Sequence, residues 1–257
     1  MKIALTGAAS GIGAATAAAL RAMGAKVTGF DIVEPEAADD WIRADLGAPD
    51  QIVGAARRAA RDGPYDALIN CAGLPPRDGN AVQILAVNFL GLRSFTEAML
   101  PQMAECGAVV HVASQAGAAW RENIAEVRDL LALSDPAQLA GFVEAHGIDP
   151  TRAYCLSKEA VIAWTVANTE RLLHMGLRAN TVSPVAVDTG ILPDCLAAMG
   201  ELADNGVVRV GRVARPREIA ELIVFLAGPH SRWIKGQDIR IDGGLNSMAQ
   251  ADELALA

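Results

Sequence analysis

The chain has 257 residues, of which 52% are hydrophobic, and its formal net charge is −8. This length fits one large α/β domain with a sizeable core. The negative charge argues against nucleic acid or an anionic membrane surface as the main partner, because both are themselves anionic.

The cysteines and the hydropathy of the chain indicate in which compartment we expect the protein. The cysteines form no Cys-x-x-Cys pair, so we expect reduced thiols and neither a metal site nor a disulfide framework. The chain opens on a predicted strand and has no apolar run long enough to span a bilayer, so we expect a cytoplasmic protein. The four cysteines are scattered along the chain: Cys71, Cys106, Cys155 and Cys195.

Strand and helix signals alternate along the chain. Short apolar runs predict strands at 3–5, 26–32, 41–44, 67–70, 108–114, 178–183 and 238–241. Helical patterns predict helices ending near residue 23 and over 49–61, 81–105, 151–175 and 216–226. Such alternation predicts a single Rossmann-type α/β domain over residues 1–257, with a doubly wound parallel sheet of about seven strands and helices on both faces.

Two stretches interrupt this alternation. Residues 115–150 have helical spacing at 124–133 and 137–143, which predicts a helical insertion before the helix at 151–175. Residues 187–210 form a second long connection, which we expect as a loop.

A glycine-rich segment, TGAASGIG, follows the first predicted strand and opens the first predicted helix. Gly7 permits a tight turn, Gly11 lets the backbone approach a pyrophosphate, and Gly13 allows close packing of helix and strand. The helix N-terminus adds free N–H groups and a positive dipole end. A glycine motif alone is as often structural, but its place at the first strand favours dinucleotide binding. The predicted contacts are Gly7, Ser10, Gly11, Ile12 and Gly13.

Asp31 lies at the end of the second predicted strand, about twenty residues beyond the glycines. A carboxylate there accepts hydrogen bonds from a ribose 2′-hydroxyl and would repel a 2′-phosphate. The next residue is Ile32, and the glycine-rich turn contains no Arg or Lys. These features favour NAD over NADP.

Tyr154 and Lys158 are four positions apart in a predicted helix, so their side chains lie on one face. The pKa of tyrosine is near ~10, and a neighbouring ammonium group lowers it. Such a pair could exchange a proton with an alcohol or carbonyl near neutral pH. The spacing by itself is common on solvated helix faces, so its meaning depends on the rest of the chain.

Several motifs in a fixed order resemble the classical short-chain dehydrogenase/reductases. Besides the glycine-rich turn they are residues 70–73 (NCAG), Asn88, Ser114, Tyr154 with Lys158, and residues 242–244 (DGG). The resemblance covers essentially the whole chain. It implies that Tyr154 is the general acid/base, that Lys158 lowers its pKa and holds the nicotinamide ribose, and that Ser114 hydrogen-bonds the reacting oxygen. Asn88 would hold a water in a proton relay.

The resemblance also implies cofactor contacts. Asp45 and Leu46 would flank the adenine, and Val187 and Thr189 would contact the nicotinamide carboxamide. The family usually has glycine where this chain has Val185, and a β-branched residue is disfavoured at positive φ. Either this turn has an ordinary conformation or the nicotinamide pocket is reshaped. The remaining implied cofactor contacts are Asn70, Ala72, Gly73, Tyr154, Lys158 and Pro184.

We expect residues 115–150 and 187–210 to form walls of the substrate pocket. Their residues near the site are mostly apolar and form no basic cluster, which favours a bulky apolar or aromatic alcohol over phosphorylated or acyl-CoA substrates. For any one of these residues, packing within the insertion explains the apolar character equally well. The expected substrate contacts are Ser114, Gln115, Trp120, Tyr154 and Leu192.

A narrower resemblance points the same way. The long gap before Tyr154, residues 87–92 (VNFLGL) and residues 231–236 (SRWIKG) are similar to bacterial coniferyl-alcohol dehydrogenases and 3α-hydroxysteroid dehydrogenase/carbonyl reductases. This implies an NAD-dependent alcohol dehydrogenase or carbonyl reductase acting on a bulky ring system.

Three alternatives remain for the function: oxidation of a polyol or other small secondary alcohol, dehydration or epimerisation, and a non-catalytic NAD-binding regulator. A non-catalytic regulator would have lost part of the tetrad Asn88, Ser114, Tyr154 and Lys158, and the sequence retains all four. Because the inserted helices would cover a face that many family members use to form tetramers, we expect a homodimer, with a tetramer as the alternative.

Overall fold

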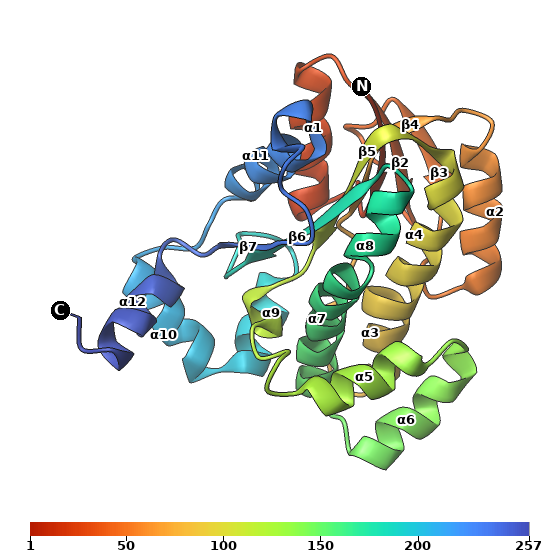
Figure 1. The fold of residues 1–257 in the computed structure, drawn as a ribbon. Helices are drawn as coiled ribbons and strands as arrows, with labels where there is room; N and C mark the ends of the chain where they lie inside the picture. Colours follow the sequence, from red (N-terminus) through yellow and green to blue (C-terminus); the bar gives the residue numbers. More distant parts are fainter. Residues whose placement is uncertain (257) are drawn as a thin grey trace.

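Seven parallel strands form one sheet in the order β3-β2-β1-β4-β5-β6-β7, with helices on both faces (Figure 1). The computed structural model describes residues 1–256, without the side chains of residues 201–205. The chain winds outward from β1 in one direction and from β4 in the other, which confirms the doubly wound Rossmann-type sheet. The strands are β1 (Lys2–Thr6), β2 (Lys26–Asp31), β3 (Asp40–Arg43), β4 (Tyr65–Asn70), β5 (Met103–Val112), β6 (Arg178–Pro184) and β7 (Asp238–Ile241).

Two layers of helices cover the sheet. Helices α1 (Gly11–Ala22) and α11 (Pro216–Ala227) lie side by side on one face (Figure 1). On the opposite face lie α2 (Pro49–Ala59), α4 (Leu92–Met99) and α7 (Pro150–Ala167). Because both faces are covered, the central strands β1, β2, β4 and β6 are almost continuously buried, as is usual for a parallel sheet.

The predicted helix at 81–105 is shorter and less regular than expected. It consists of α3 (Ala81–Leu85), a π-helical turn (Ala86–Gly91) and α4, and β5 already begins at Met103. An ideal Cβ at Gly91 would lie 2.0 Å from the carbonyl oxygen of Leu46, so only glycine allows this close approach. The wide turn also contains Asn88, one of the predicted tetrad residues.

The predicted helix at 151–175 is divided at Asn168, whose ψ of 0° ends α7 before α8 (Thr169–His174) begins. Residues 187–210, expected as a loop, contain α9 (Leu192–Met199) and α10 (Glu201–Val210). A further helix, α12 (Leu245–Glu253), follows β7 and was not expected. Short 3-10 turns occupy Leu100–Gln102, Gln115–Gly117, Pro136–Gln138 and Pro229–Ser231.

The predicted insertion contains α5 (Ile124–Ala132) and α6 (Leu139–His146). Both helices lie at the far end of α3 and α7 (Figure 1) and share one apolar cluster with them. The contacts α5–α7 and α3–α6 place the insertion over the outer side of the α3–α7 pair.

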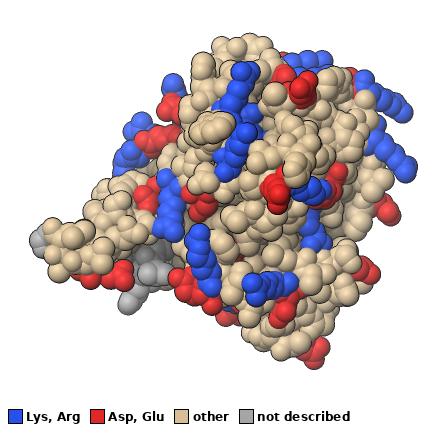
Figure 2. Space-filling view, viewed as in Figure 1, with Lys and Arg blue, Asp and Glu red and all other residues tan. Residues whose placement is uncertain are grey.

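On the face shown in Figure 2, basic and acidic side chains are interspersed. No helix in the described part of the chain is both long enough and apolar enough to cross a bilayer.

Candidate active site

The glycine-rich turn links β1 to α1 as expected. Gly7 has a φ of +68°, and a Cβ there would lie 2.6 Å from the Ala72 backbone nitrogen. A Cβ on Gly13 would lie 1.9 Å from the carbonyl oxygen of Gly7. Both positions therefore require glycine, one for conformation and both for space. Ser10 occupies the N-cap of α1 without using its side chain as a cap, which leaves its hydroxyl free to bind a ligand phosphate.

Asp31 is held beside this turn by backbone donors. Its two carboxylate oxygens accept hydrogen bonds from the N–H groups of Ala9 (3.0 Å) and Val33 (3.1 Å). The first of these bonds fixes the end of β2 against the glycine-rich turn. The carboxylate keeps further lone pairs with which it can accept a bond from a ligand hydroxyl.

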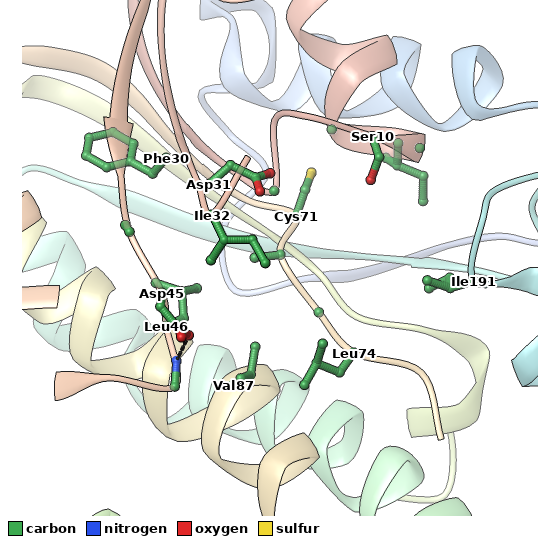
Figure 3. Close-up of a pocket in the computed structure, with 18 of the residues that line it drawn as sticks. Ser10, Phe30, Asp31, Ile32, Asp45, Leu46, Cys71, Leu74, Val87 and Ile191 are labelled. Atoms are coloured by element: carbon green, nitrogen blue, oxygen red, sulfur yellow. Dashed lines mark hydrogen bonds between the residues drawn. The ribbon is translucent and has the colours of Figure 1, made fainter. Parts of the chain in front are cut away.

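A cavity of about 560 Å³ runs along these strand ends. Figure 3 shows Asp31, Ile32, Asp45, Leu46 and Val87 around it. The N–H of Gly47 donates a 2.8 Å hydrogen bond to Asp45 Oδ1, drawn as the dashed line, and this bond orients the Asp45 side chain. The predicted cofactor residues that line this cavity are Gly7, Ser10, Gly11, Ile12, Gly13, Asp31, Asp45, Leu46, Ala72, Gly73 and Thr189.

A second cavity of about 540 Å³ adjoins the first. It contains the predicted catalytic residues Ser114, Tyr154 and Lys158, together with Pro184 and Val187. The two cavities share one wall and therefore lie next to each other. The shared lining residues are Ile12, Cys71, Gly73, Leu74, Thr189 and Ile191.

The predicted catalytic side chains converge from two elements. Ser114 follows β5 and hydrogen-bonds the hydroxyl of Tyr154, which comes from α7. The ammonium of Lys158 lies 5.6 Å from the centre of the Tyr154 ring and donates a 3.1 Å hydrogen bond to the carbonyl oxygen of Val112. Tyr154 and Lys158 are 8% and 6% exposed, so this chemistry would take place largely away from bulk water.

Burial changes the pKa values of both groups. It raises the pKa of Tyr154 above that of an ordinary tyrosine, while the hydrogen bond from Ser114 acts in the opposite direction. Burial is the largest cause of this shift, and the expectation that Lys158 lowers the pKa of Tyr154 remains a prediction. Burial lowers the pKa of Lys158 itself to about 8.

Asn88 is fully buried beneath the site. Its Oδ1 accepts a 2.7 Å hydrogen bond from the N–H of Leu74, and its Nδ2 donates a 3.0 Å bond to the carbonyl of Leu74. A Cβ on Gly73 would lie 3.4 Å from Asn88 Oδ1 and 3.7 Å from Lys158 Nζ. Asn88 thus shapes the chain around Gly73, and its part in a proton relay remains a prediction.

Two predicted contacts line neither cavity. Asn70 is buried, and its Nδ2 lies 3.0 Å from both Thr96 Oγ1 and His111 Nδ1, so its side chain ties the sheet to α4 instead of facing a ligand. Trp120 packs against the α3–α7 cluster, with the guanidinium of Arg121 4.2 Å from its ring centre. Their side chains are thus engaged in packing within the protein, and both ligand contacts remain predictions.

Of the two alternatives for the turn at Val185, an ordinary conformation or a reshaped pocket, the structure has the first. Its φ is not positive, so the backbone has an ordinary conformation and the side chain lines the second cavity. Gln115 and Leu192 also line this cavity as expected. The amide of Gln115 donates a 3.0 Å hydrogen bond to Asp242, which joins the end of β5 to the end of β7.

The inserted helices do not form the pocket wall that the sequence suggested. Of the segment 115–150, Gln115, Ala116 and Ala118 line the second cavity, whereas residues 119–150, all of which the structure describes, line neither cavity. The segment 187–210 does line this cavity, through residues of α9 and α10 such as Cys195, Met199 and Arg209, and α12 adds Asn246. Regular helical spacing in 192–199 was the one available signal for α9.

The fold and the two joined cavities define the class: an α/β protein with a dinucleotide-type site that opens onto a buried Ser-Tyr-Lys group. Among the described residues, no cluster of His, Cys, Asp or Glu is arranged to hold a metal ion. Two family models match the chain, "short chain dehydrogenase" over residues 2–125 and "Enoyl-(Acyl carrier protein) reductase" over residues 138–246.

Individual relatives match over nearly their full length. A coniferyl-alcohol dehydrogenase of Pseudomonas is 36% identical over 96% of both chains. A 3-alpha-hydroxysteroid dehydrogenase/carbonyl reductase of Comamonas testosteroni is 32% identical over 96% of both. The crystal structure of a Pseudomonas 3-alpha-hydroxysteroid dehydrogenase complexed with NADH superimposes with a TM-score of 0.84 at 32% identity, covering 98% of this chain and 99% of that one. The chain belongs to the short-chain dehydrogenase/reductase family and is an oxidoreductase of that family.

Proposed function

We propose that this protein is an NAD-dependent oxidoreductase that interconverts a bulky apolar or aromatic alcohol and its carbonyl compound. The observation that carries the proposal is the shared wall of the two cavities. A dinucleotide lying along the glycine-rich turn would reach the second cavity exactly where Ser114, Tyr154 and Lys158 converge. The names of the matched relatives, which act on coniferyl alcohol and 3-alpha-hydroxysteroids, support the same class of substrate.

The first cavity fits NAD better than NADP. Asp31 presents a carboxylate beside the glycine-rich turn, and no Arg or Lys is among the described residues that line this cavity. A ribose 2′-hydroxyl can donate to that carboxylate, whereas a 2′-phosphate would meet like charge without a cation to offset it. The related structure with bound NADH supports this choice.

The residues of the second cavity would handle the proton. The chemistry that the dinucleotide supplies is transfer of a hydride to or from its nicotinamide ring. Tyr154 would take the hydroxyl proton during oxidation and return it during reduction, while Ser114 holds the oxygen. Lys158, with a pKa of about 8, can hold or release a proton near neutral pH next to this phenol.

A screen of NAD reduction over a panel of alcohols tests the proposal. The panel contains coniferyl alcohol, benzylic alcohols, 3-hydroxysteroids and polyols, each assayed with NAD and with NADP. We expect turnover of the ring alcohols with NAD. Activity confined to polyols would refute the substrate class, and a preference for NADP would refute the part given to Asp31.

We further propose that the protein is a cytoplasmic homodimer. The insertion covers the outer side of α3 and α7, while Trp233 (93% exposed) and Phe225 (43% exposed) remain uncovered near α11. The cysteines are all unpaired, which suits a reducing compartment. Light scattering should give a dimer that Trp233→Arg weakens; a stable tetramer would contradict the assignment.

A further inference from the structure

The second cavity carries polar groups at two separate places. Ser114, Tyr154 and Lys158 lie at its buried end. Arg209 and Asn246 lie where α10 and α12 meet the solvent, and the side chain of Arg209 is 38% exposed. Among the lining residues whose side chains are described, Lys158 and Arg209 are the only charged ones. Most of the other lining residues are apolar.

The packing of α12 on α10 brings Arg209 to the cavity. Gly206 lies one helical turn before Arg209, and a Cβ there would be 3.2 Å from Leu245 Cδ2, so the two helices approach closely. Leu245, Asn246 and Ala249 line the cavity from α12. In Figure 1 these two helices lie together beyond β7, at one end of the molecule.

The guanidinium of Arg209 is oriented but only partly used. Its Nη2 donates to the carbonyl of Met248 (3.0 Å) and to Asp252 Oδ2 (2.5 Å). Among the residues whose side chains are described, Nε and Nη1 have no hydrogen-bond partner. An arginine can donate five hydrogen bonds and commonly binds a carboxylate through two nitrogens. Asp252 is 63% exposed, so solvent screens much of its charge.

We propose that Arg209 is an anion-binding site at the mouth of the substrate cavity and that the preferred substrates are ring alcohols bearing a carboxylate remote from the carbinol carbon. The inference rests on the proposed function, because it assumes that the carbinol lies at Tyr154. The ring would fill the apolar middle of the cavity, and the carboxylate would lie beside the one cation at its outer rim. No acidic side chain among the described lining residues opposes that charge.

Two matched substrates separate the effect of a remote negative charge from the effect of ring shape. 4-(Hydroxymethyl)benzoate and its methyl ester share the ring and the carbinol, and differ in charge at the far end. We expect kcat/KM of the native protein to be about tenfold or more higher for the carboxylate. Arg209→Gln should lower this preference about tenfold through KM of the carboxylate. Asp252→Asn removes the competing anion, so it should raise the preference. Equal preference in all three proteins would overturn the proposal.

The two substitutions also distinguish anion binding by Arg209 from a purely structural role of this residue. If the Arg209–Asp252 pair only fastened α12 to α10, both variants would reduce kcat/KM for both probes by the same factor and leave the preference unchanged. Arg212→Gln is the matched control, since Arg212 pairs with Glu218 and lines neither cavity. It should leave the preference as in the native protein.

A binding measurement keeps this inference separate from the proposed function. Benzoate can be titrated into the protein with bound NADH while the nicotinamide fluorescence is followed. We expect about tenfold weaker binding of benzoate to Arg209→Gln. Equal binding to both proteins would overturn the anion site. A lack of turnover across the alcohol panel, with benzoate binding still dependent on Arg209, would instead refute the proposed reaction and retain the site.

Discussion

The two cavities share a wall but are assembled in different ways. The dinucleotide cavity is built mainly from segments that directly follow β1, β2, β3 and β4, so short stretches of sequence position its contacts. The second cavity, which we propose holds the substrate, collects residues from β5, α7, α9, α10 and α12, which are far apart in the chain. In a parallel sheet, strand ends meet at one edge by topology, whereas helices beyond the sheet are placed only by packing.

The contacts that stabilise the two cavities differ in the same way: those of the first are local, and those of the second are long-range. Gly7 and Gly13 are held by contacts within the strand–turn–helix unit and with the neighbouring strand. The substrate side depends on long-range bonds, such as Gln115 to Asp242 and Arg209 to α12. We therefore expect substitutions in the first half to change cofactor use and substitutions in the second to change turnover or substrate selection.

Tyr154→Phe should have the largest effect on activity. It removes the phenol that exchanges the proton while keeping the ring, so turnover should fall about 10³-fold or more. Tyr154 lines only the second cavity, so the Kd for NADH should stay within about twofold of the native value. Steady-state kinetics and a fluorescence titration measure the two quantities. Substantial turnover by this variant would eliminate Tyr154 as the acid/base.

Arg152→Met should have the largest effect on stability. Arg152 bonds Glu159, which is 1% exposed, and Glu126 of the insertion. Its loss would leave a buried carboxylate without its cation and should lower the free energy of unfolding by about 3 kcal/mol. Chemical denaturation measures this. Arg217→Met is the control, because its exposed pair with Glu221 should contribute under about 1 kcal/mol. Equal losses would show that the insertion is not anchored by this group.

Asp31→Asn should change the choice of cofactor. The substitution keeps the size and oxygen acceptor of the side chain but removes the charge that would repel a 2′-phosphate. The ratio of kcat/KM for NAD to that for NADP should fall about tenfold, equivalent to about 1.4 kcal/mol. Assays with both cofactors measure the ratio. An unchanged ratio would place cofactor selection elsewhere in the cavity.

At neutral pH His111 should have the smallest effect, because its influence on stability develops only as the pH falls. Burial lowers the pKa of His111 to about 3, below the ordinary value of 6.5. Between these values the unfolded chain binds more protons than the folded one, so the unfolding free energy should fall as pH falls from 6.5 toward 3. The slope is at most about 1.4 kcal/mol per pH unit for this one group. His111→Gln should reduce the slope; an identical slope would contradict the assignment.

Much of the architecture was predictable from short-range signals. The glycine-rich turn, Asp31, and the spacing of Tyr154 and Lys158 identified the dinucleotide turn and the catalytic helix. The helix boundary at Asn168 and the start of β5 at Met103 were missed because the apolar pattern continues through both. Asn70 and Trp120 line neither cavity, which the sequence did not indicate, since a motif does not state which way a side chain turns when His111 or α7 offers a partner.

The sequence by itself determined the order of the strands along the chain, the glycines at positions without room for a side chain, and the residue types of the predicted catalytic group. Those features depend on local backbone geometry and on spacing within one element. The tertiary structure decided that the insertion supports α7 from outside, and that α10 and α12 bring Arg209 to the substrate cavity. These outcomes depend on packing between distant segments, such as Gly206 against Leu245, which no local pattern encodes.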